Sequence, residues 1–230
     1  MKVGEYKSLE KALDYNLKRF KGNLKFVHQA EMEIIEAWLA SFGQKSIIFD
    51  LGAGTGRAIK SLLKAKPKII YAFDESPAML KLLKENYPNE IKKGLVKIMV
   101  GSSDKISLPG SSVDIVISLH VFKHIKDINQ TLKETHRILK TGGVIIFDVL
   151  NINSIVRFNL GTCYALDKSS VIKSLEKNGF NIVKIVPLHA FGETVYNFPG
   201  SSIINLMDKF LTGTGLPIGT KFFILTKKHA

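Results

Sequence analysis

Short apolar runs alternate with amphipathic segments along the middle of this 230-residue chain. Runs that are apolar throughout indicate strands buried on both faces, and apolar residues at spacings of three and four indicate helices. The pattern predicts strands at residues 46–52, 68–74, 94–101, 112–120 and 144–151. It predicts helices at residues 57–66, at 77–87, where Pro88 marks the stop, and at 127–143. Strands separated by helices predict a parallel sheet covered on both faces, which is a doubly wound α/β architecture.

Different patterns flank this alternation on both sides. Helical periodicity in the N-terminal part stops at Gly43, and a helix and two strands follow the alternation at residues 167–180, 181–189 and 221–228. The expected organisation is an N-terminal helical lid at 1–44, a core at 45–150, and a C-terminal part of the same domain at 151–230 with a substrate-side insertion at 190–219.

The first predicted strand ends in a glycine-rich turn, with Gly52, Gly54 and Gly56 at alternate positions. Such a turn lies at the edge of a parallel sheet where ligands bind, and glycines let a ligand lie against the main chain. A dinucleotide loop would need a glycine where Arg57 stands, and no phosphate-binding P-loop string occurs. Asp50 would repel a pyrophosphate, so the turn favours a cationic ligand without phosphate.

Asp74 ends the second predicted strand, where an acid can accept hydrogen bonds from both hydroxyls of a ribose. The alternative is a residue near the start of the helix that begins at Pro77. The glycine turn on the neighbouring strand favours the ribose.

The motifs FDLGAGTGRAIKSL, IIYAFDESPAMLKLL and VDIVISLHVFKHIKD occur in this order. With them the chain resembles the class I S-adenosylmethionine-dependent methyltransferases over roughly residues 46–150. It is most similar to the small-molecule group that includes enzymes of ubiquinone and menaquinone biosynthesis. The resemblance implies a Rossmann-like, seven-stranded, mostly parallel sheet whose last strand is antiparallel.

The resemblance also implies S-adenosylmethionine as the cofactor, with S-adenosylhomocysteine as its product. The methionine end would lie over the glycine turn, including Ala53, and Asp50 would favour its ammonium group. Glu75 and Met79 would line the adenine pocket, although Met79 suits a helix core equally well. These enzymes usually place an aspartate after the third strand, where this chain has Ser102. Ser102 with Ser103, Asp104 two positions later, or backbone groups would then bind the adenine.

His120 follows the fourth strand at the same edge of the sheet, so it should face the methionine end of the cofactor. We expect it to contact cofactor or acceptor, and a general-base role is a further hypothesis. His124, four residues later, suits packing between helix and sheet better than metal binding, because no third ligand is evident. No metal is expected.

The expected acceptor is a small apolar or aromatic molecule. No Asp/Asn-Pro-Pro-aromatic string, typical of enzymes that methylate amino groups of nucleic acids, follows the fourth strand. Tyr15 and Tyr164 are candidate substrate contacts. The other candidates for an apolar lid are Phe20, Phe26, His28, Phe191, Tyr196, Phe198, Ile203, Leu206, Met207 and Phe210.

The formal net charge of +13 is spread over lysines along the chain. It leaves open an RNA or protein methyltransferase that docks through a basic surface, but it does not favour one. A cofactor-binding regulator without activity is a second alternative. One cysteine excludes an internal disulfide. Neither a signal peptide nor an apolar run of spanning length is evident, which predicts a cytoplasmic protein. The expected oligomeric state is a monomer or homodimer.

Overall fold

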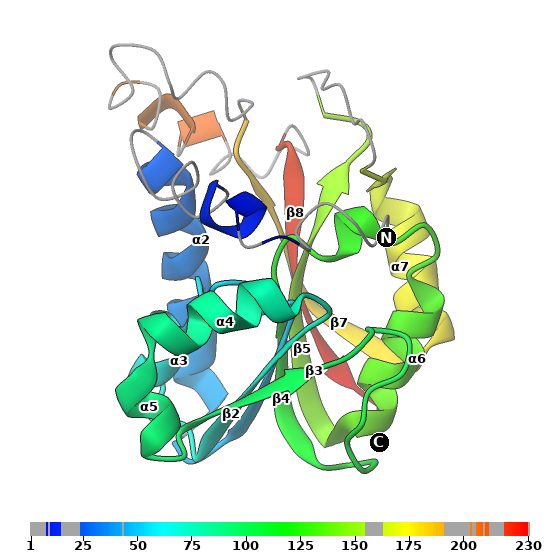
Figure 1. Ribbon diagram of the computed structural model, residues 1–230. Helices are drawn as coiled ribbons and strands as arrows, with labels where there is room; N and C mark the ends of the chain where they lie inside the picture. Colours follow the sequence, from blue (N-terminus) through cyan, green and yellow to red (C-terminus); the bar gives the residue numbers. More distant parts are fainter. Residues whose placement is uncertain are drawn as a thin grey trace.

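The structure is a computed structural model, and its side chains and backbone are described over most of the chain. The described residues are 8, 10–14, 24–42, 44–154, 163–190, 203, 206–208, 210–211 and 219–229. Within them an N-terminal helix and a central sheet are the main elements (Figure 1). The helices are α2 (Leu24–Leu39), α3 (Ile59–Lys64), α4 (Pro77–Asn86), α5 (Pro88–Lys92), α6 (Asn129–Ile138) and α7 (Lys168–Lys177).

The strands form one sheet in the order β3-β2-β1-β4-β5-β8-β7, and a short strand, β6, pairs with β5. Their bounds are β1 (Ile47–Leu51), β2 (Ile69–Asp74), β3 (Val96–Val100), β4 (Val113–Ser118), β5 (Leu139–Asn151), β6 (Ala165–Leu166), β7 (Phe180–Leu188) and β8 (Lys221–Lys228). The first five strands run parallel, and β8 lies antiparallel between β5 and β7. The predicted doubly wound sheet with an antiparallel last strand is confirmed.

Two apolar clusters cover the two faces of the sheet. Helices α2, α3, α4 and α5 lie on one side and α6 and α7 on the other (Figure 1). Residues such as Trp38 and Leu62 pack on the first face, and Phe147 and Phe180 on the second. Burying each such side chain contributes about 2 kcal/mol. Because helices cover both faces of the sheet, the strands are apolar on both sides. The polar residues at the carboxyl ends of the parallel strands then meet at one edge of the sheet.

Two helices differ from the sequence pattern. The helix predicted at 127–143 ends at Ile138, because Leu139 already pairs with Val113 in the sheet. The pattern missed α5, since Pro88 was interpreted as a stop although it is the first residue of a new helix.

Candidate active site

The glycine turn follows β1 and is tied to the end of β2. The backbone N–H groups of Gly52 and Ala53 both donate to the carbonyl oxygen of Phe73, at 2.8 and 3.0 Å. Gly52 has a φ of 79°, and a β-carbon there would lie 2.1 Å from Cγ2 of Val121. Gly54 has a φ of 54° and no atom within 4 Å of such a β-carbon among the described residues. The turn therefore leaves open space beside Gly54, where a ligand can approach the main chain.

Gly56 has a different environment from the other two glycines. A β-carbon on Gly56 would lie 2.6 Å from the Tyr87 ring, whose hydroxyl donates to the Gly56 carbonyl at 3.1 Å. Packing of the Tyr87 ring against the turn therefore requires a glycine at this position. A cofactor contact of Gly56 stays a prediction.

Asp74 connects the glycine turn to the start of α4. Its Oδ2 accepts from the N–H of Gly54 at 2.9 Å and its Oδ1 from the N–H of Ser76 at 2.8 Å. Burial raises the pKa of this carboxyl, and the two backbone hydrogen bonds oppose that shift. Ser76, rather than Asp74, is the residue that caps α4, because its hydroxyl accepts from the N–H of Met79. Asp74 lines the pocket, so its carboxylate can accept a further hydrogen bond from a ligand hydroxyl.

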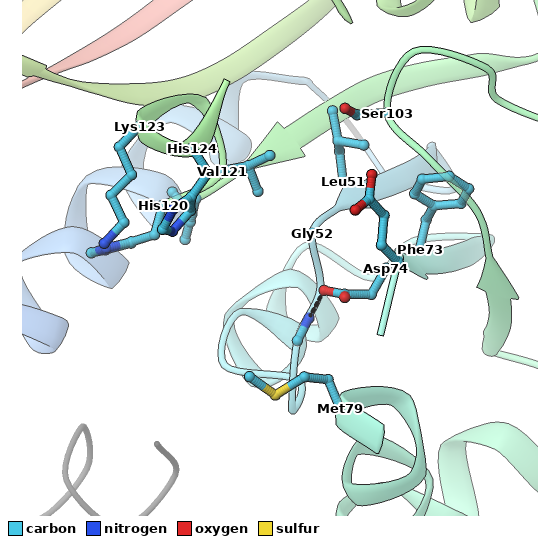
Figure 2. A pocket seen from close by; sticks show the side chains of 13 residues that line it. Leu51, Gly52, Phe73, Asp74, Met79, Ser103, His120, Val121, Lys123 and His124 are labelled. Atoms are coloured by element: carbon cyan, nitrogen blue, oxygen red, sulfur yellow. Dashed lines mark hydrogen bonds between the residues drawn. The ribbon is translucent and has the colours of Figure 1, made fainter. Parts of the chain in front are cut away.

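A pocket opens at this edge of the sheet. Figure 2 shows Asp74 and Met79 on one side of Gly52, and His120, Lys123 and His124 on the other. Its lining consists of Leu51, Gly52, Gly54, Phe73, Asp74, Glu75, Met79, Ser103, Leu119, His120, Val121, Lys123 and His124. The pocket therefore has an acidic part beside β2 and a part with imidazole and lysine groups after β4, joined by apolar side chains.

Two of the residues that were predicted to bind the adenine form a hydrogen bond with each other. Ser102 donates from Oγ to Oε1 of Glu75 at 2.8 Å, so its hydroxyl holds the neighbouring carboxylate. The other oxygen, Oε2 of Glu75, is buried and has no hydrogen-bond partner among the described residues. Ser103 lines the pocket, whereas Asp104 is exposed and does not. This geometry favours Glu75 and Ser103 over Asp104 as adenine contacts.

Asp50 lies beneath the glycine turn and is only 2% exposed. Burial and the neighbouring Asp74 raise its pKa to about 7, and the cation of Arg57 limits the shift. Its Oδ2 has no hydrogen-bond partner within the described part of the chain. A buried acid with an unused oxygen is suited to a ligand cation, although Asp50 is not among the residues that line the pocket.

The sequence analysis missed a buried ionic cluster next to the pocket. Glu31 of α2 is fully buried and contacts Arg57, His120, Lys221 and His189 from four other segments, with Nε2 of His189 3.9 Å from its Oε1. Its Oε2 accepts a hydrogen bond from Arg57. Its Oε1 lies 2.7 Å from Nζ of Lys221 on β8 and 3.0 Å from Nε2 of His120. Burial opposes ionisation of Glu31, but the cations of Lys221 and Arg57 outweigh it and hold the pKa of that carboxyl well below its ordinary value.

One signal could have identified Glu31. Val27, Glu31, Ile35 and Trp38 follow one another at helical spacings of three and four, and all four are buried. A carboxylate on the apolar stripe of a helix costs free energy unless it is paired, so such a residue predicts a buried partner.

His120 has strained backbone geometry. Its φ of 61° lies in the left-handed region, which costs a non-glycine residue roughly 1–3 kcal/mol. The carboxylate of Asp148 holds this conformation, because its Oδ1 accepts from the His120 N–H at 2.6 Å. Burial and the cation of Lys221 lower the pKa of His120 well below its ordinary value, although Glu31 opposes them. The ring is therefore neutral near pH 7.

The remaining predicted site residues have other environments. Tyr164 is 41% exposed and does not line the pocket, although its N–H donates to the Lys123 carbonyl at 2.6 Å. The side chains of Ile203, Leu206, Met207 and Phe210 are 50 to 74% exposed. Phe26 is half-buried, and His28 contacts Arg57. Tyr15, Phe20, Phe191, Tyr196 and Phe198 lie outside the described residues.

Neither a metal-binding cluster nor a membrane-spanning helix occurs among the described residues. They contain no group of three or more histidine, cysteine, aspartate or glutamate side chains placed to hold a metal ion. In the same ranges, no helix is long and apolar enough to cross a membrane.

S-Adenosylmethionine fits the groups in and beside the pocket. The open side of Gly54, the carboxylate of Asp74, and the oxygens of Asp50 and Glu75 that have no hydrogen-bond partner among the described residues suit a nucleoside that carries an ammonium group. These groups, the sheet order and the antiparallel β8 agree with the resemblance to the class I S-adenosylmethionine-dependent methyltransferases. Residues 49–147 match the family described as Methyltransferase domain.

Several proteins are similar to the chain over this domain. A methyltransferase-like protein of Schizosaccharomyces pombe is 33% identical over 56% of the chain and 50% of its own length. Malonyl-(acyl-carrier protein) O-methyltransferase 1 of Coxiella burnetii is 33% identical over 45% of the chain and 33% of its own length. Demethylmenaquinone methyltransferase of Chlorobaculum tepidum is 30% identical over 42% of the chain and 37% of its own length. The chain thus spans half or less of the length of these three relatives.

The fold is shared with solved methyltransferase structures. The complex between the Haloferax volcanii Trm112 methyltransferase activator and a methyltransferase contains a chain that superposes with a TM-score of 0.70 at 17% identity. The superposition covers 96% of this chain and 97% of that one. At such low identity it supports the fold alone, including the parts outside residues 49–147.

Proposed function

We propose that this protein transfers the methyl group of S-adenosylmethionine to a small apolar or aromatic molecule. The observation that carries the proposal is the pocket itself, whose acidic part beside Asp74 continues into a part formed by Leu119, His120 and Val121. The first part suits the ribose and adenine, and the second offers the acceptor an apolar space beside the imidazoles of His120 and His124 and the amine of Lys123.

The chain's own residues would bind and orient the two reactants. Asp74 would accept from the ribose hydroxyls, Glu75 and Ser103 would contact the adenine, and Asp50 would favour the ammonium group. The bound cofactor supplies an electrophilic methyl group, so transfer depends chiefly on an acceptor held close and in line. His120 is suited to this task, because a neutral imidazole can accept a hydrogen bond from an acceptor hydroxyl or amine. Its lowered pKa makes orientation a better role for it than strong general-base catalysis.

Labelled cofactor incubated with fractionated cell extract tests the proposal. We expect label in a small organic molecule. Label in RNA, with binding that weakens steeply from low to moderate salt, would instead support an enzyme that docks through its basic surface. Tight binding of cofactor without label in any fraction would support a regulator. Calorimetry that detects no binding of S-adenosylmethionine or S-adenosylhomocysteine would overturn the assignment as a whole.

Asp50 gives a separate prediction about proton release. The free protein holds a proton on this carboxyl at pH 6, because its pKa is raised to about 7. A cofactor ammonium group beside Asp50 favours the carboxylate, so binding of S-adenosylhomocysteine at pH 6 should release part of one proton. Calorimetry in buffers with different ionisation enthalpies measures this release. The Asp50→Asn variant should show none, and a wild-type binding enthalpy that is independent of buffer would contradict the placement of the ammonium group.

A further inference from the structure

His124 is a second histidine of the pocket wall. It lines the pocket, and Figure 2 shows it on the same side as His120 and Lys123. The side chain is half-buried, and its ring forms no hydrogen bond with the described residues. Neither ring nitrogen is among the buried polar atoms that lack a partner, so solvent reaches both nitrogens. A ring that solvent reaches in the wall of a pocket can bind a molecule that enters the pocket.

The two imidazoles of the pocket differ in what they already contact. Nε2 of His120 lies 3.0 Å from Oε1 of Glu31, and His120 is only 9% exposed. Its ring therefore belongs to the buried ionic cluster. The ring of His124 has no such contact, so its hydrogen-bonding capacity is left for a ligand.

The backbone that carries His124 is held on both sides. His124 ends the short 3-10 helix η2 (Phe122–His124), in which Phe122 is buried. The N–H of His124 donates to the carbonyl of Val121 at 2.9 Å, and the carbonyl of Lys123 accepts from the N–H of Tyr164 at 2.6 Å. A side chain on such a fixed turn is held in place before a ligand binds.

Val121 connects this turn to the glycine turn. A β-carbon on Gly52 would lie 2.1 Å from Cγ2 of Val121, so the Val121 side chain packs directly on the glycine turn. The proposed function places the methionine end of the cofactor over that turn. His124 follows Val121 by three positions, in the part of the pocket where an acceptor would meet the methyl group.

We propose that His124 binds the methyl acceptor by accepting a hydrogen bond from its reacting hydroxyl group, which makes the acceptor an apolar molecule that carries a hydroxyl. This inference rests on the proposed function. Burial and the cation of Lys123 lower the pKa of His124 to about 4. The ring is therefore neutral near pH 7, and one of its nitrogens has a lone pair that can accept.

A hydroxyl needs such a partner more than an amine does. The acceptor oxygen forms its bond to the methyl carbon while the bond from that carbon to sulfur breaks and leaves its electron pair on sulfur. The oxygen becomes positively charged, and its proton becomes strongly acidic. Even a weakly basic imidazole takes this proton and passes it to the solvent that reaches the ring. The expected product carries an O-methyl group.

Diethyl pyrocarbonate tests whether the ring is open to the pocket, because this reagent modifies neutral imidazoles that solvent reaches. The reaction is run at about pH 6, where an ordinary histidine is largely protonated, and mass spectrometry identifies the modified residues. We expect His124 to be modified in the wild type. With S-adenosylhomocysteine bound, the acceptor found by labelling should slow this modification about tenfold or more.

Two results of this experiment would overturn the proposal: an unmodified His124, or modification at the same rate with both ligands bound. The first measurement requires no acceptor, and calorimetry observes binding of S-adenosylhomocysteine separately. A failure of the inference therefore differs from a failure of the proposed function.

Two variants separate hydrogen bonding from packing. His124→Phe keeps a ring of similar size but cannot accept a hydrogen bond, and His124→Gln offers a carbonyl oxygen instead. We expect kcat/KM for the acceptor to fall about 30-fold in His124→Phe and about threefold in His124→Gln. The dissociation constant of S-adenosylhomocysteine should change less than about twofold in both, because the contact is made to the acceptor.

His136→Phe is the matched control. The half-buried ring of His136 packs edge to face on Phe180, with ring centroids 5.4 Å apart, and His136 does not line the pocket. Its replacement should leave kcat/KM unchanged. Thermal unfolding shows whether each variant is folded, and His124→Leu replaces His124→Phe if the latter is not. A packing role of His124 predicts the reverse order, with more activity in His124→Phe than in His124→Gln. That order, or label in an N-methyl or C-methyl group, would refute the proposal.

Discussion

Replacement of Asp74 by alanine should weaken binding of S-adenosylhomocysteine about 100-fold, because hydrogen bonds from ligand hydroxyls to a carboxylate contribute roughly 1.5–3 kcal/mol each. The loss has a second source, since the N–H groups of Gly54 and Ser76 lose the acceptor that fixes the glycine turn. Isothermal titration calorimetry measures the dissociation constant.

Asp104→Ala is the matched control for this prediction. Asp104 is exposed on the loop after β3 and does not line the pocket, so its removal should leave the dissociation constant unchanged. The two variants also decide between the alternatives for the adenine. If Asp104→Ala weakened binding as much as Asp74→Ala, the exclusion of Asp104 would be wrong. Unchanged binding by Asp74→Ala would refute the ribose assignment of Asp74.

Replacement of Lys221 by methionine should lower the free energy of unfolding by about 3 kcal/mol, since removing one partner of a buried ion pair leaves the other uncompensated. Nζ of Lys221 lies 2.7 Å from Glu31 and 3.7 Å from Asp148, and the residue is 4% exposed. In a chain of this length the melting temperature should fall by roughly 9 °C. The pKa of His120 should rise toward its ordinary value, because the cation of Lys221 no longer opposes protonation.

Differential scanning calorimetry and an NMR titration of His120 check the two parts of this prediction. Lys227→Met on the same strand is the control, because Lys227 is exposed and its loss should change neither quantity. Equal melting temperatures for the two variants would show that the cluster does not depend on Lys221.

The sequence was sufficient for most of the fold because its strands are buried on both faces. Continuous apolar runs such as that of β1 can hardly form anything else between helices. The prediction was wrong at Leu139, where local helical periodicity was overridden by pairing with Val113, a partner 26 positions away. Pairing between distant residues is not visible in a local pattern, so the first residue of β5 could be identified only in the structure.

The candidate site could be predicted only where its residues lie in local sequence motifs. Asp74 and Gly54 lie in local motifs, and the structure brings them within one hydrogen bond of each other. Glu31 and Lys221 lie in no motif, and they meet only because α2 and β8 both reach the pocket edge. Gly56 is the opposite case. It lies inside the motif, but its packing against the Tyr87 ring is sufficient to explain why a glycine is needed there.

The position of β8 also determines when the site can assemble. Glu31 and Lys221 are separated by 190 positions, and β8 is inserted between β5 and β7, which are made earlier. During synthesis, a nascent chain without β8 would have β5 and β7 as unpaired edges and a buried acid without its lysine. Closure of such a long loop is slow. The ionic cluster around His120 can therefore be complete only after β8 has joined the sheet.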